Sequence, residues 1–499
     1  MENTNLPSQS VSPQAAGVNP PQATPLYSRP PEPKISTSPQ TSVPGSNQTM
    51  GTKLNLGPSM PPSPKRKAPG KIFLFLGIFV FIVLAGFVAY KLLSGVTKKA
   101  SPVEITWWGL WEEESAYSGV IAEYQTQNPN VTIKYVKQSP QDYRERLTNA
   151  LAKGTGPDIF MFHNSWVPMF SSELDNVPAS VASAADIAQD YYPVISTDLT
   201  SGTGIVGIPL GYDALTLFIN ETLFANEGMD PPATWDDLRE KAKTLTKVEN
   251  GVITQAGVAL GRTENVDHWP EIVALMMIQN GADLTNPQGK LAEDALLFYT
   301  LFSRVDGVWD ITLPSSTAAF ASGKLAMYFG PSWRAFNIKE QNPELSFRTV
   351  PLPQLAKEDP NDPDIGYATY WANGVWGRSE KKDEAWKFIK FLSSKDSLEK
   401  IYKQESAQRG FGEAYPRVDM ANILLEHPTL ASVIKLAPTA ESWYLADRTF
   451  DGSTGINTQL KKYFEDAINA INEGDEASDA TEPLVKGVKQ VLTQYGLLK

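Results

Sequence analysis

The sequence contains no cysteine and only three histidines, His163, His268 and His427. The absence of cysteine excludes disulfide scaffolds, thiolate zinc sites, iron–sulfur clusters, and cysteine nucleophiles or lipid anchors. So few histidines argue against a histidine-rich metal site, and no cofactor is expected. The enzyme motifs G-x-S-x-G, H-E-x-x-H and G-x-x-x-x-G-K-[ST] are also absent, which disfavours three large classes of enzyme.

Charge and composition are distributed unevenly along the 499 residues. Residues 1–100 hold ten Lys/Arg and two Asp/Glu, whereas the remaining residues hold 34 Lys/Arg and 54 Asp/Glu. Fifteen of the 38 prolines precede Gly70, and all twelve tryptophans follow Ser101. The sequence therefore predicts a disordered, proline-rich tail over residues 1–70 and an acidic globular body. The acidity of the body argues against nucleic-acid binding, which needs a basic surface.

A long uncharged run, IFLFLGIFVFIVLAGFVAY, separates tail and body and extends from Ile72 to Tyr90. These nineteen residues would span about 29 Å as a helix, close to the hydrocarbon thickness of about 30 Å. A cleaved signal peptide would need a leader of about seventy residues, which is unusually long. We expect a transmembrane signal anchor over residues 71–93 and a linker over 94–101. The N-terminus is expected in the cytoplasm and the body outside the cell membrane.

The body alternates β-rich and helical segments. Strands are expected at 103–107, 131–136 and 158–162, with helices at 115–127 and 142–151 between them. This β-α-β-α-β order predicts a parallel sheet, and ligands bind beyond the carboxyl ends of the strands in such sheets. Later elements are too numerous for one sheet, which favours two α/β lobes. Strands are expected at 214–219 and 252–260, and a helix begins after Thr234 as its cap. Residues 320–333 are expected to form a short helix, a strand and a turn, and further helices are expected at 382–392, 420–425, 457–472 and 483–494.

Six short motifs of the body occur in the same order as in a known protein family. They are Ile105–Trp108, Gly154–Phe160 (GTGPDIF), Gly207–Leu210 with Asn220, Thr234–Leu238, Phe320–Met327 (FASGKLAM) and Ala385–Leu392. Together they resemble bacterial extracellular solute-binding proteins of the maltose-binding type, the ligand-capture subunits of ABC importers. The resemblance covers about residues 102–495. It departs from the family in having Ile219 before Asn220, where a tyrosine is usual, and in lacking the cysteine that carries a lipid.

This resemblance implies an α/β fold of the periplasmic-binding-protein type (type II), with two lobes and the ligand in the cleft between them. The chain would cross between the lobes near Tyr212, Leu352 and Arg409. The solute-binding domain would then cover residues 102–499, with lobe 1 at about 102–212 and 352–408. Lobe 2 would cover about 213–351 and 409–499. A monomer is expected, working with ABC permease subunits in the membrane.

The tryptophans around the expected cleft point to a carbohydrate ligand. The C–H face of a sugar ring stacks on an aromatic plane, and its hydroxyls need polar partners. Asp213 is the leading polar candidate, while Trp235, Trp309, Trp376 and Trp386 are expected in the core. By position in the family, the resemblance assigns ligand binding to Trp111, Glu112, Asn164, Trp166, Tyr212, Asp213, Glu264, Asn265, Trp333, Tyr370, Trp371 and Trp443.

The sequence thus predicts a membrane-anchored protein that captures a carbohydrate by hinge closure and delivers it to an importer, without catalysis. Two alternatives stay open. A membrane-anchored glycoside hydrolase would also use a tryptophan-lined cleft, with a pair of carboxylates. A sensor would transmit closure through the membrane to the N-terminal tail.

Overall fold

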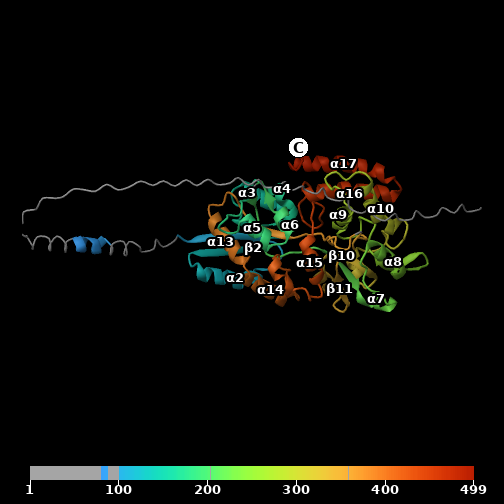
Figure 1. Ribbon diagram of the computed structural model, residues 1–499, viewed down its shortest axis with the longest axis horizontal. Coiled ribbons are helices and arrows are strands. Elements are labelled where there is room, and N and C mark those ends of the chain that lie inside the picture. Colours follow the sequence, from blue (N-terminus) through green and yellow to red (C-terminus); the bar gives the residue numbers. More distant parts are fainter. Residues whose placement is uncertain (1–79, 88–100, 203, 358, 499) are drawn as a thin grey trace, which may run out of the picture. The chain divides into compact units, whose positions relative to one another are not determined.

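The computed structural model describes residues 80–87, 101–202, 204–357 and 359–498. The expected tail and most of the expected membrane anchor and linker lie outside these residues. Within the expected anchor, residues 80–87 are helical and carry exposed apolar side chains, including Phe81 and Phe87. Among the described residues, no helix is both long enough and apolar enough to cross a membrane. From Glu104 onward the described chain belongs to one compact unit (Figure 1).

One five-stranded sheet organises the first lobe, with the strand order β2-β1-β3-β12-β6. Strands β1 and β3 pair in parallel, with Trp107 opposite Ile159, as the β-α-β-α-β order predicts. Strand β12 comes from much later in the chain and pairs antiparallel with β3. The strands are β1 (Val103–Gly109), β2 (Val131–Lys137), β3 (Ile159–His163), β6 (Ile208–Pro209) and β12 (Trp371–Val375).

A second five-stranded sheet organises the second lobe, with the order β11-β7-β10-β9-β8. Its central strand β10 pairs antiparallel with β7 and parallel with β9. All seven residues of β10 are buried, which fits a strand covered by helices on both faces. The strands are β7 (Leu215–Asn220), β8 (Lys247–Glu249), β9 (Val252–Val258), β10 (Leu325–Pro331) and β11 (Phe347–Val350).

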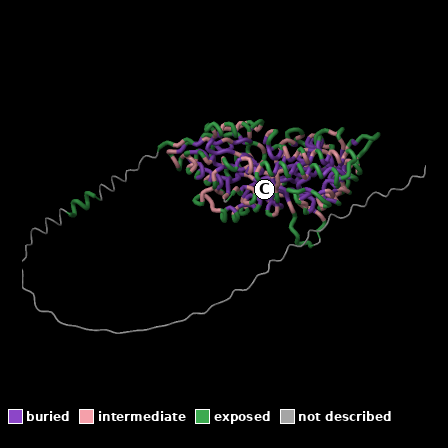
Figure 2. Tube along the Cα trace, turned by 90° about the horizontal axis from the view of Figure 1, so that it is seen from above, coloured by how far each residue is buried: buried purple, intermediate pink, exposed green. Residues whose placement is uncertain are grey.

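Helices cover both sheets, and buried residues fill the interior of each lobe (Figure 2). Trp235, Trp309, Trp376 and Trp386 are all buried, as expected. The helices of the first lobe are α2 (Glu114–Gln127), α3 (Tyr143–Ala152), η1 (Asn164–Trp166), α4 (Val167–Phe170), α5 (Ala184–Asp190), α6 (Pro193–Asp198), α13 (Lys382–Leu392), α14 (Lys395–Arg409) and η2 (Val418–Ile423), beside the short hairpin β4 (Thr200–Ser201) and β5 (Gly204–Ile205). The remaining helices are α7 (Glu221–Glu227), α8 (Trp235–Leu245), α9 (Trp269–Gln279), α10 (Lys290–Arg304), α11 (Ser316–Ala321), α12 (Arg334–Gln341), α15 (Ala431–Leu436), η3 (Ala437–Thr439), α16 (Ile456–Glu473) and α17 (Ala477–Gln494).

Several helix bounds follow local signals in the sequence, although the helix expected at 420–425 is the 3-10 helix η2. Thr234 caps α8, because its side chain accepts a hydrogen bond from the backbone N–H of Asp237, as expected. Helix α13 buries one apolar face over the range expected. Helix α17, by contrast, begins at Ala477 and contains Pro483, which was expected to start it. Ala477 and Ala480 are buried in the core of the second lobe, and this packing extends the helix past the proline.

The chain passes three times between the lobes. It passes first between β6 and β7, and again between β11 and β12. After α14 the chain stays on the first lobe, because Arg417 forms a bridge with Tyr191 and an ion pair with Asp190. Helix α15 then contacts β7 and β11 of the second lobe. The third passage therefore follows η2, later than the crossing expected near Arg409.

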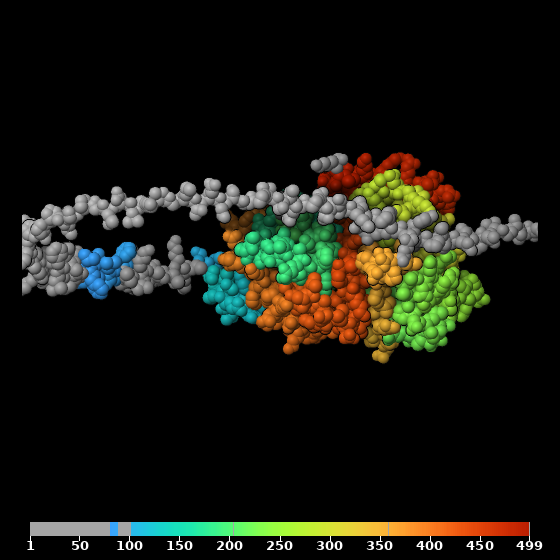
Figure 3. All heavy atoms as spheres, viewed as in Figure 1, coloured from blue at the N-terminus to red at the C-terminus, as the bar shows by residue number. Residues whose placement is uncertain are grey.

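The C-terminal helices belong to the second lobe. Helices α16 and α17 pack against each other and against α10. Their apolar side chains, Leu460 and Leu484 among them, join the hydrophobic core of that lobe. In the space-filling view they form the red surface over part of the second lobe (Figure 3).

Candidate functional site

A cavity of about 410 Å³ lies between the two lobes. Residues after β1, within β3 and at β12 line it from the first lobe, and residues of α9, β10 and α12 line it from the second. Residues of α14 and of the first passage between the lobes also line it. The lining includes Trp111, Glu112, His163, Tyr370, Trp371, Glu405, Arg409 and Glu413 from the first lobe, Tyr212 and Asp213 from the first passage between the lobes, His268, Glu271, Trp333 and Phe336 from the second lobe, and Asp447, Arg448 and Phe450 from the segment before α16.

Seven of the twelve predicted site residues line this cavity. They come from sequence positions up to 260 residues apart, brought together by the two sheets. The seven are Trp111, Glu112, Tyr212, Asp213, Trp333, Tyr370 and Trp371. The remaining five, Asn164, Trp166, Glu264, Asn265 and Trp443, do not line it.

Trp371 sits at the centre of an aromatic cluster in the first lobe. Its ring lies edge-on to that of Trp111, with centroids 5.3 Å apart. Trp166 packs on another side of it, also edge-on at 5.3 Å. Trp166 is itself fully buried and stacks with Tyr143 and Phe170, so it supports Trp371 from behind instead of reaching the cavity.

Asn164 does not line the cavity but contacts a residue that does. Its Nδ2 donates to Asp198 at 2.9 Å, and its Oδ1 accepts the backbone N–H of Tyr370 at 3.3 Å. The hydroxyl of Tyr370 donates to the same Asp198 carboxylate at 3.0 Å. Asn164 thus positions Tyr370, which does line the cavity. Asn164 and Trp443 line a second cavity of about 430 Å³ beside Asp198.

Glu264 and Asn265 stabilise a loop of the second lobe. Asn265 donates from Nδ2 to the carbonyls of Asp310 and Leu313, and accepts Nε1–H of Trp309 at 2.8 Å. Glu264 accepts the neighbouring backbone N–H of Thr263. The side-chain amide of Asn265 therefore makes its hydrogen bonds within the second lobe.

Asp213 lies on the cavity but its carboxylate is used by the backbone. Oδ1 accepts the N–H groups of Ala214 and Ser332, at 2.8 and 3.0 Å, and Oδ2 accepts that of Trp333 at 3.3 Å. Burial, together with the charge of Glu413, raises the pKa of Asp213 to about 7. Asp213 therefore ties the first passage between the lobes to the end of β10.

Arg409 gathers three carboxylates at one side of the cavity. Its Nη1 donates to Glu112 at 2.5 Å, and its Nη2 donates to Glu413 at 3.0 Å and Glu405 at 3.4 Å. Burial and the neighbouring negative charges raise the pKa of Glu405 to about 8, and burial also raises that of Glu112. Gly211 allows Glu413 to approach this closely, because a Cβ at 211 would lie 2.7 Å from its Cβ. We call Glu112, Glu405, Arg409 and Glu413 the acidic cluster.

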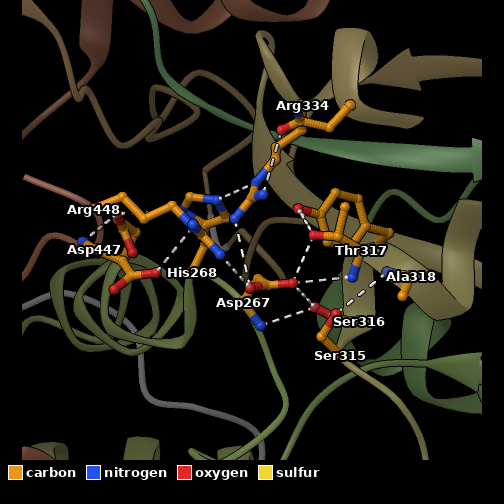
Figure 4. A network of polar contacts seen from close by, with 12 residues as sticks. Asp267, His268, Ser315, Ser316, Thr317, Ala318, Arg334, Asp447 and Arg448 are labelled. Carbon is orange, nitrogen blue, oxygen red and sulfur yellow. Dashed lines mark hydrogen bonds and ion pairs between the residues drawn. The ribbon is translucent and has the colours of Figure 1, made fainter. Parts of the chain in front are cut away.

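Charges are balanced at the other side of the cavity (Figure 4). Asp267 pairs with Arg334 and Arg448, at 3.5 and 3.2 Å. Nε of Arg334 donates to Nε2 of His268 at 2.8 Å, so His268 presents Nδ1 to Glu271. Burial opposes ionisation of Asp267, but hydrogen bonds from Thr317 and the charge of Arg334 outweigh it and lower the pKa to about 2.

This balanced network fixes Trp333. The guanidinium of Arg334 lies over the Trp333 ring, 4.5 Å from its centroid. The ring of His268 meets Trp333 edge-on at 5.7 Å. Trp333 is therefore held from two sides at the wall of the second lobe, facing the cavity.

Backbone strain also concentrates here. Five described non-glycine residues have positive φ, and three of them, His268, Arg448 and Phe450, line the cavity. Left-handed backbone costs free energy for a residue with a side chain, and such residues gather at functional sites. Within the described chain, no group of three or more metal-binding side chains could hold a metal ion.

Much of the acidic cluster and of the balanced network could not be predicted from the sequence. Glu405, Arg409 and Glu413 follow one another at intervals of four, a spacing that places Glu405 and Arg409 on one face of α14. That pattern could have drawn attention to them. His268, Glu271 and Arg448 give no comparable signal, because only the fold brings α9 beside the 447–450 segment.

Comparisons with known proteins agree on the architecture. A family model described as bacterial extracellular solute-binding protein matches residues 108–399. A maltotriose-binding protein of Pyrococcus abyssi is 21% identical over 315 residues, which cover 60% of this chain and 63% of the relative.

Solved structures are similar over almost their entire length. A cyclo/maltodextrin-binding protein complexed with maltotetraose superposes with a TM-score of 0.64 and 16% identity, covering 79% of this chain and 99% of the other. An ABC transporter solute-binding protein from Thermotoga lettingae, bound with α-D-tagatose, gives a TM-score of 0.60 and 19% identity. It covers 78% of this chain and 99% of the other. At these identities the likeness establishes the two-lobed fold.

Proposed function

The chain belongs to the bacterial extracellular solute-binding protein family, and on that basis we propose that it captures a carbohydrate between its two lobes. The observation that carries the proposal is the placement of indole rings on both sides of one cavity. Trp111 and Trp371 line it from the first lobe, and Trp333 lines it from the second. A sugar ring between them would stack its C–H faces on aromatic planes.

Polar groups beside these rings suit the hydroxyls of such a ligand. Carboxylates and two guanidiniums line the cavity, among them those of Glu112, Arg409 and Arg448. These groups accept and donate hydrogen bonds in fixed directions, as recognition of a polyhydroxylated ligand requires. The relatives whose names or complexes specify maltotriose and maltotetraose support this ligand class.

Capture would work by closure of the lobes around the ligand. Contacts made by both lobes favour the closed form over the open one, and a shift from 1:99 to 99:1 needs about 5.5 kcal/mol of preference. The three passages of chain between the lobes are the hinge. We further propose that residues 71–93 anchor the protein in the cell membrane with the lobes outside, and that the ligand is passed to an ABC permease.

We propose capture without turnover. Three acids on the cavity already bind groups of the protein: Glu112 and Glu413 each bind Arg409 through one oxygen, and Asp213 accepts three backbone N–H groups. A glycoside hydrolase needs one carboxylic acid and one carboxylate free to act on either side of the bond.

The test measures closure and ligand integrity together. Because the chain has no cysteine, Ala122→Cys in α2 and Ala225→Cys in α7 introduce two unique, exposed labelling positions, one on each lobe. We expect the distance between spin labels there to change saturably with at least one member of a glycan panel. Mass spectrometry should recover that glycan intact. A distance that no glycan changes, or a glycan returned cleaved, contradicts the proposal.

A further inference from the structure

The negative charge of the cavity is concentrated at one side. In the acidic cluster, three carboxylates share one guanidinium, whereas the opposite side pairs Asp267 and Asp447 with Arg334, Arg448 and Lys461. Asp213 adds a further acid beside Glu413. The cluster therefore carries two negative charges in excess when its carboxyls are ionised, and no described cation other than Arg409 contacts Glu405.

Each carboxylate of the cluster keeps one oxygen without a donor. Arg409 binds Oε1 of Glu112, Oε1 of Glu413 and Oε2 of Glu405. The backbone N–H of Glu413 adds a second donor to Oε2 of Glu405, at 2.8 Å. Within the described chain, Oε2 of Glu112, Oε1 of Glu405 and Oε2 of Glu413 thus accept no hydrogen bond. All three carboxylates bind one guanidinium at 3.4 Å or less, and all three residues line the cavity.

Two observations outside the cluster point to a missing partner in the same cavity. Glu271 is 1% exposed and lines the cavity, and its Oε2 has no hydrogen-bond partner. The hydroxyl of Tyr212, which is fully buried and lines the cavity, is also unpartnered. Buried polar groups left unpaired cost free energy, and a bound water or ion is one of the explanations for such a group in a native structure.

We propose that the ligand of this cavity is an amino-bearing carbohydrate whose protonated amine sits at the acidic cluster. This inference rests on the proposed function and specifies its ligand class. A primary ammonium offers three donors and no acceptor, which matches three carboxylate oxygens that lack a donor. It also offsets the excess negative charge, which a hydroxyl cannot do. The raised pKa of Glu405 has the same origin as the proposed recognition, because burial and unbalanced negative charge disfavour its ionised form.

The rest of the cavity fits the remainder of such a ligand. The ring of Phe336 lies under Arg409, 4.8 Å from the guanidinium carbon, and 4.2 Å from the ring of Phe411. Phe336 and Phe411 thus form an apolar floor beside the cluster. Trp111 and Trp371 stand on the same lobe as Glu112 and would receive the sugar face.

The test compares sugars that differ in a single group. Titration calorimetry of the full chain at neutral pH would use glucose with glucosamine, galactose with galactosamine, and mannose with mannosamine. We expect at least one amine to bind tenfold or more tightly than its hydroxyl partner. We also expect N-acetylation of that amine to abolish the advantage, because it removes the charge.

Variants test whether the tighter binding of the amine depends on the acidic cluster. The isosteric double variant Glu405→Gln with Glu413→Gln should reduce the amine's advantage to threefold or less, whereas Glu264→Gln, off the cavity, should leave it unchanged. Should the double variant fail to fold, proton release supplies the second measurement. Binding of an amine to the wild-type chain should release protons from the cluster, seen as heats that differ between two buffers of unlike ionisation enthalpy.

The outcomes separate this inference from the proposed function. Neutral sugars that bind as tightly as their amines, or an advantage that survives the double variant, overturn the amine assignment and leave carbohydrate capture intact. Absence of proton release overturns the assignment as well. Failure of every sugar, amine or neutral, in both calorimetry and the label-distance measurement overturns the proposed function itself.

Discussion

The carboxylate of Asp213 accepts the backbone N–H of Trp333, and so ties the first passage between the lobes to an aromatic residue on the wall of the second lobe. The same carboxylate accepts the N–H groups of Ala214 and Ser332. Asp213, the leading polar candidate for ligand contact, therefore holds Trp333, another candidate, in place.

Replacing Asp213 should therefore reduce stability. Asp213→Ala leaves three backbone N–H groups without this acceptor, and an unpaired buried group costs about 1–3 kcal/mol. We expect the free energy of unfolding in urea to fall by at least that amount. Asp475→Ala, an exposed acid in the turn between α16 and α17, is the matched control and should change little. Equal stability of the two variants would show that Asp213 does not hold β10.

Trp333 should contribute directly to ligand affinity. We expect Trp333→Ala to weaken the saturable response to a bound glycan by about tenfold, or about 1.4 kcal/mol, because the sugar loses one aromatic plane. Trp443→Phe provides the comparison, since Trp443 packs against Tyr444 and Phe464 away from this cavity. Intrinsic fluorescence titration measures both. Unchanged affinity in Trp333→Ala would remove this residue from the site.

Glu405 should make stability depend on pH. Its pKa is raised to about 8 in the folded chain, above the ordinary value of 4.5, so folding favours the protonated form. The contribution of Glu405 to stability is therefore fully present below pH 4.5 and is lost as pH rises through about 8. The charges of Glu112, Glu413 and Arg409 shift the pKa of Glu405. The charge of Glu405 in turn raises the pKa of four neighbouring phenols, those of Tyr117, Tyr135, Tyr402 and Tyr415.

Glu405→Gln tests this dependence. Glutamine cannot ionise, so the melting temperature of the variant should gain on that of the wild type as pH rises from 5 to 9. Glu473→Gln, an exposed position on α16, should track the wild type throughout. A constant difference between Glu405→Gln and the wild type across this range would contradict the assignment.

The cap of α8 gives a purely local prediction. Thr234→Ala removes the acceptor for the N–H of Asp237 and should cost about 1 kcal/mol in urea unfolding. Thr244→Ala removes a threonine from the last turn of the same helix, where its hydroxyl only donates to the carbonyl of Glu240. That control should be nearly neutral. Equal losses in both variants would mean that the cap adds nothing.

Local patterns in the sequence determined the elements and the class of fold. The cap at Thr234, the apolar face of α13 and the alternation of strands and helices depend on residues a few positions apart, so periodicity and capping reveal them. The order of short motifs indicated the family, and position in that family brought Trp111 and Trp371 into the predicted site.

Only the tertiary structure decided what each side chain in the site does. Sequence position put Asn164, Trp166 and Asp213 near the cleft, but the direction of each side chain depends on neighbours over a hundred residues away, such as Tyr370, Trp371 and Ser332. The acidic cluster has the same origin, since Glu112 reaches Arg409 across 297 positions of sequence. Periodicity reports which face of an element is buried. Packing between distant elements determines which polar groups remain unpaired, and those groups define the site.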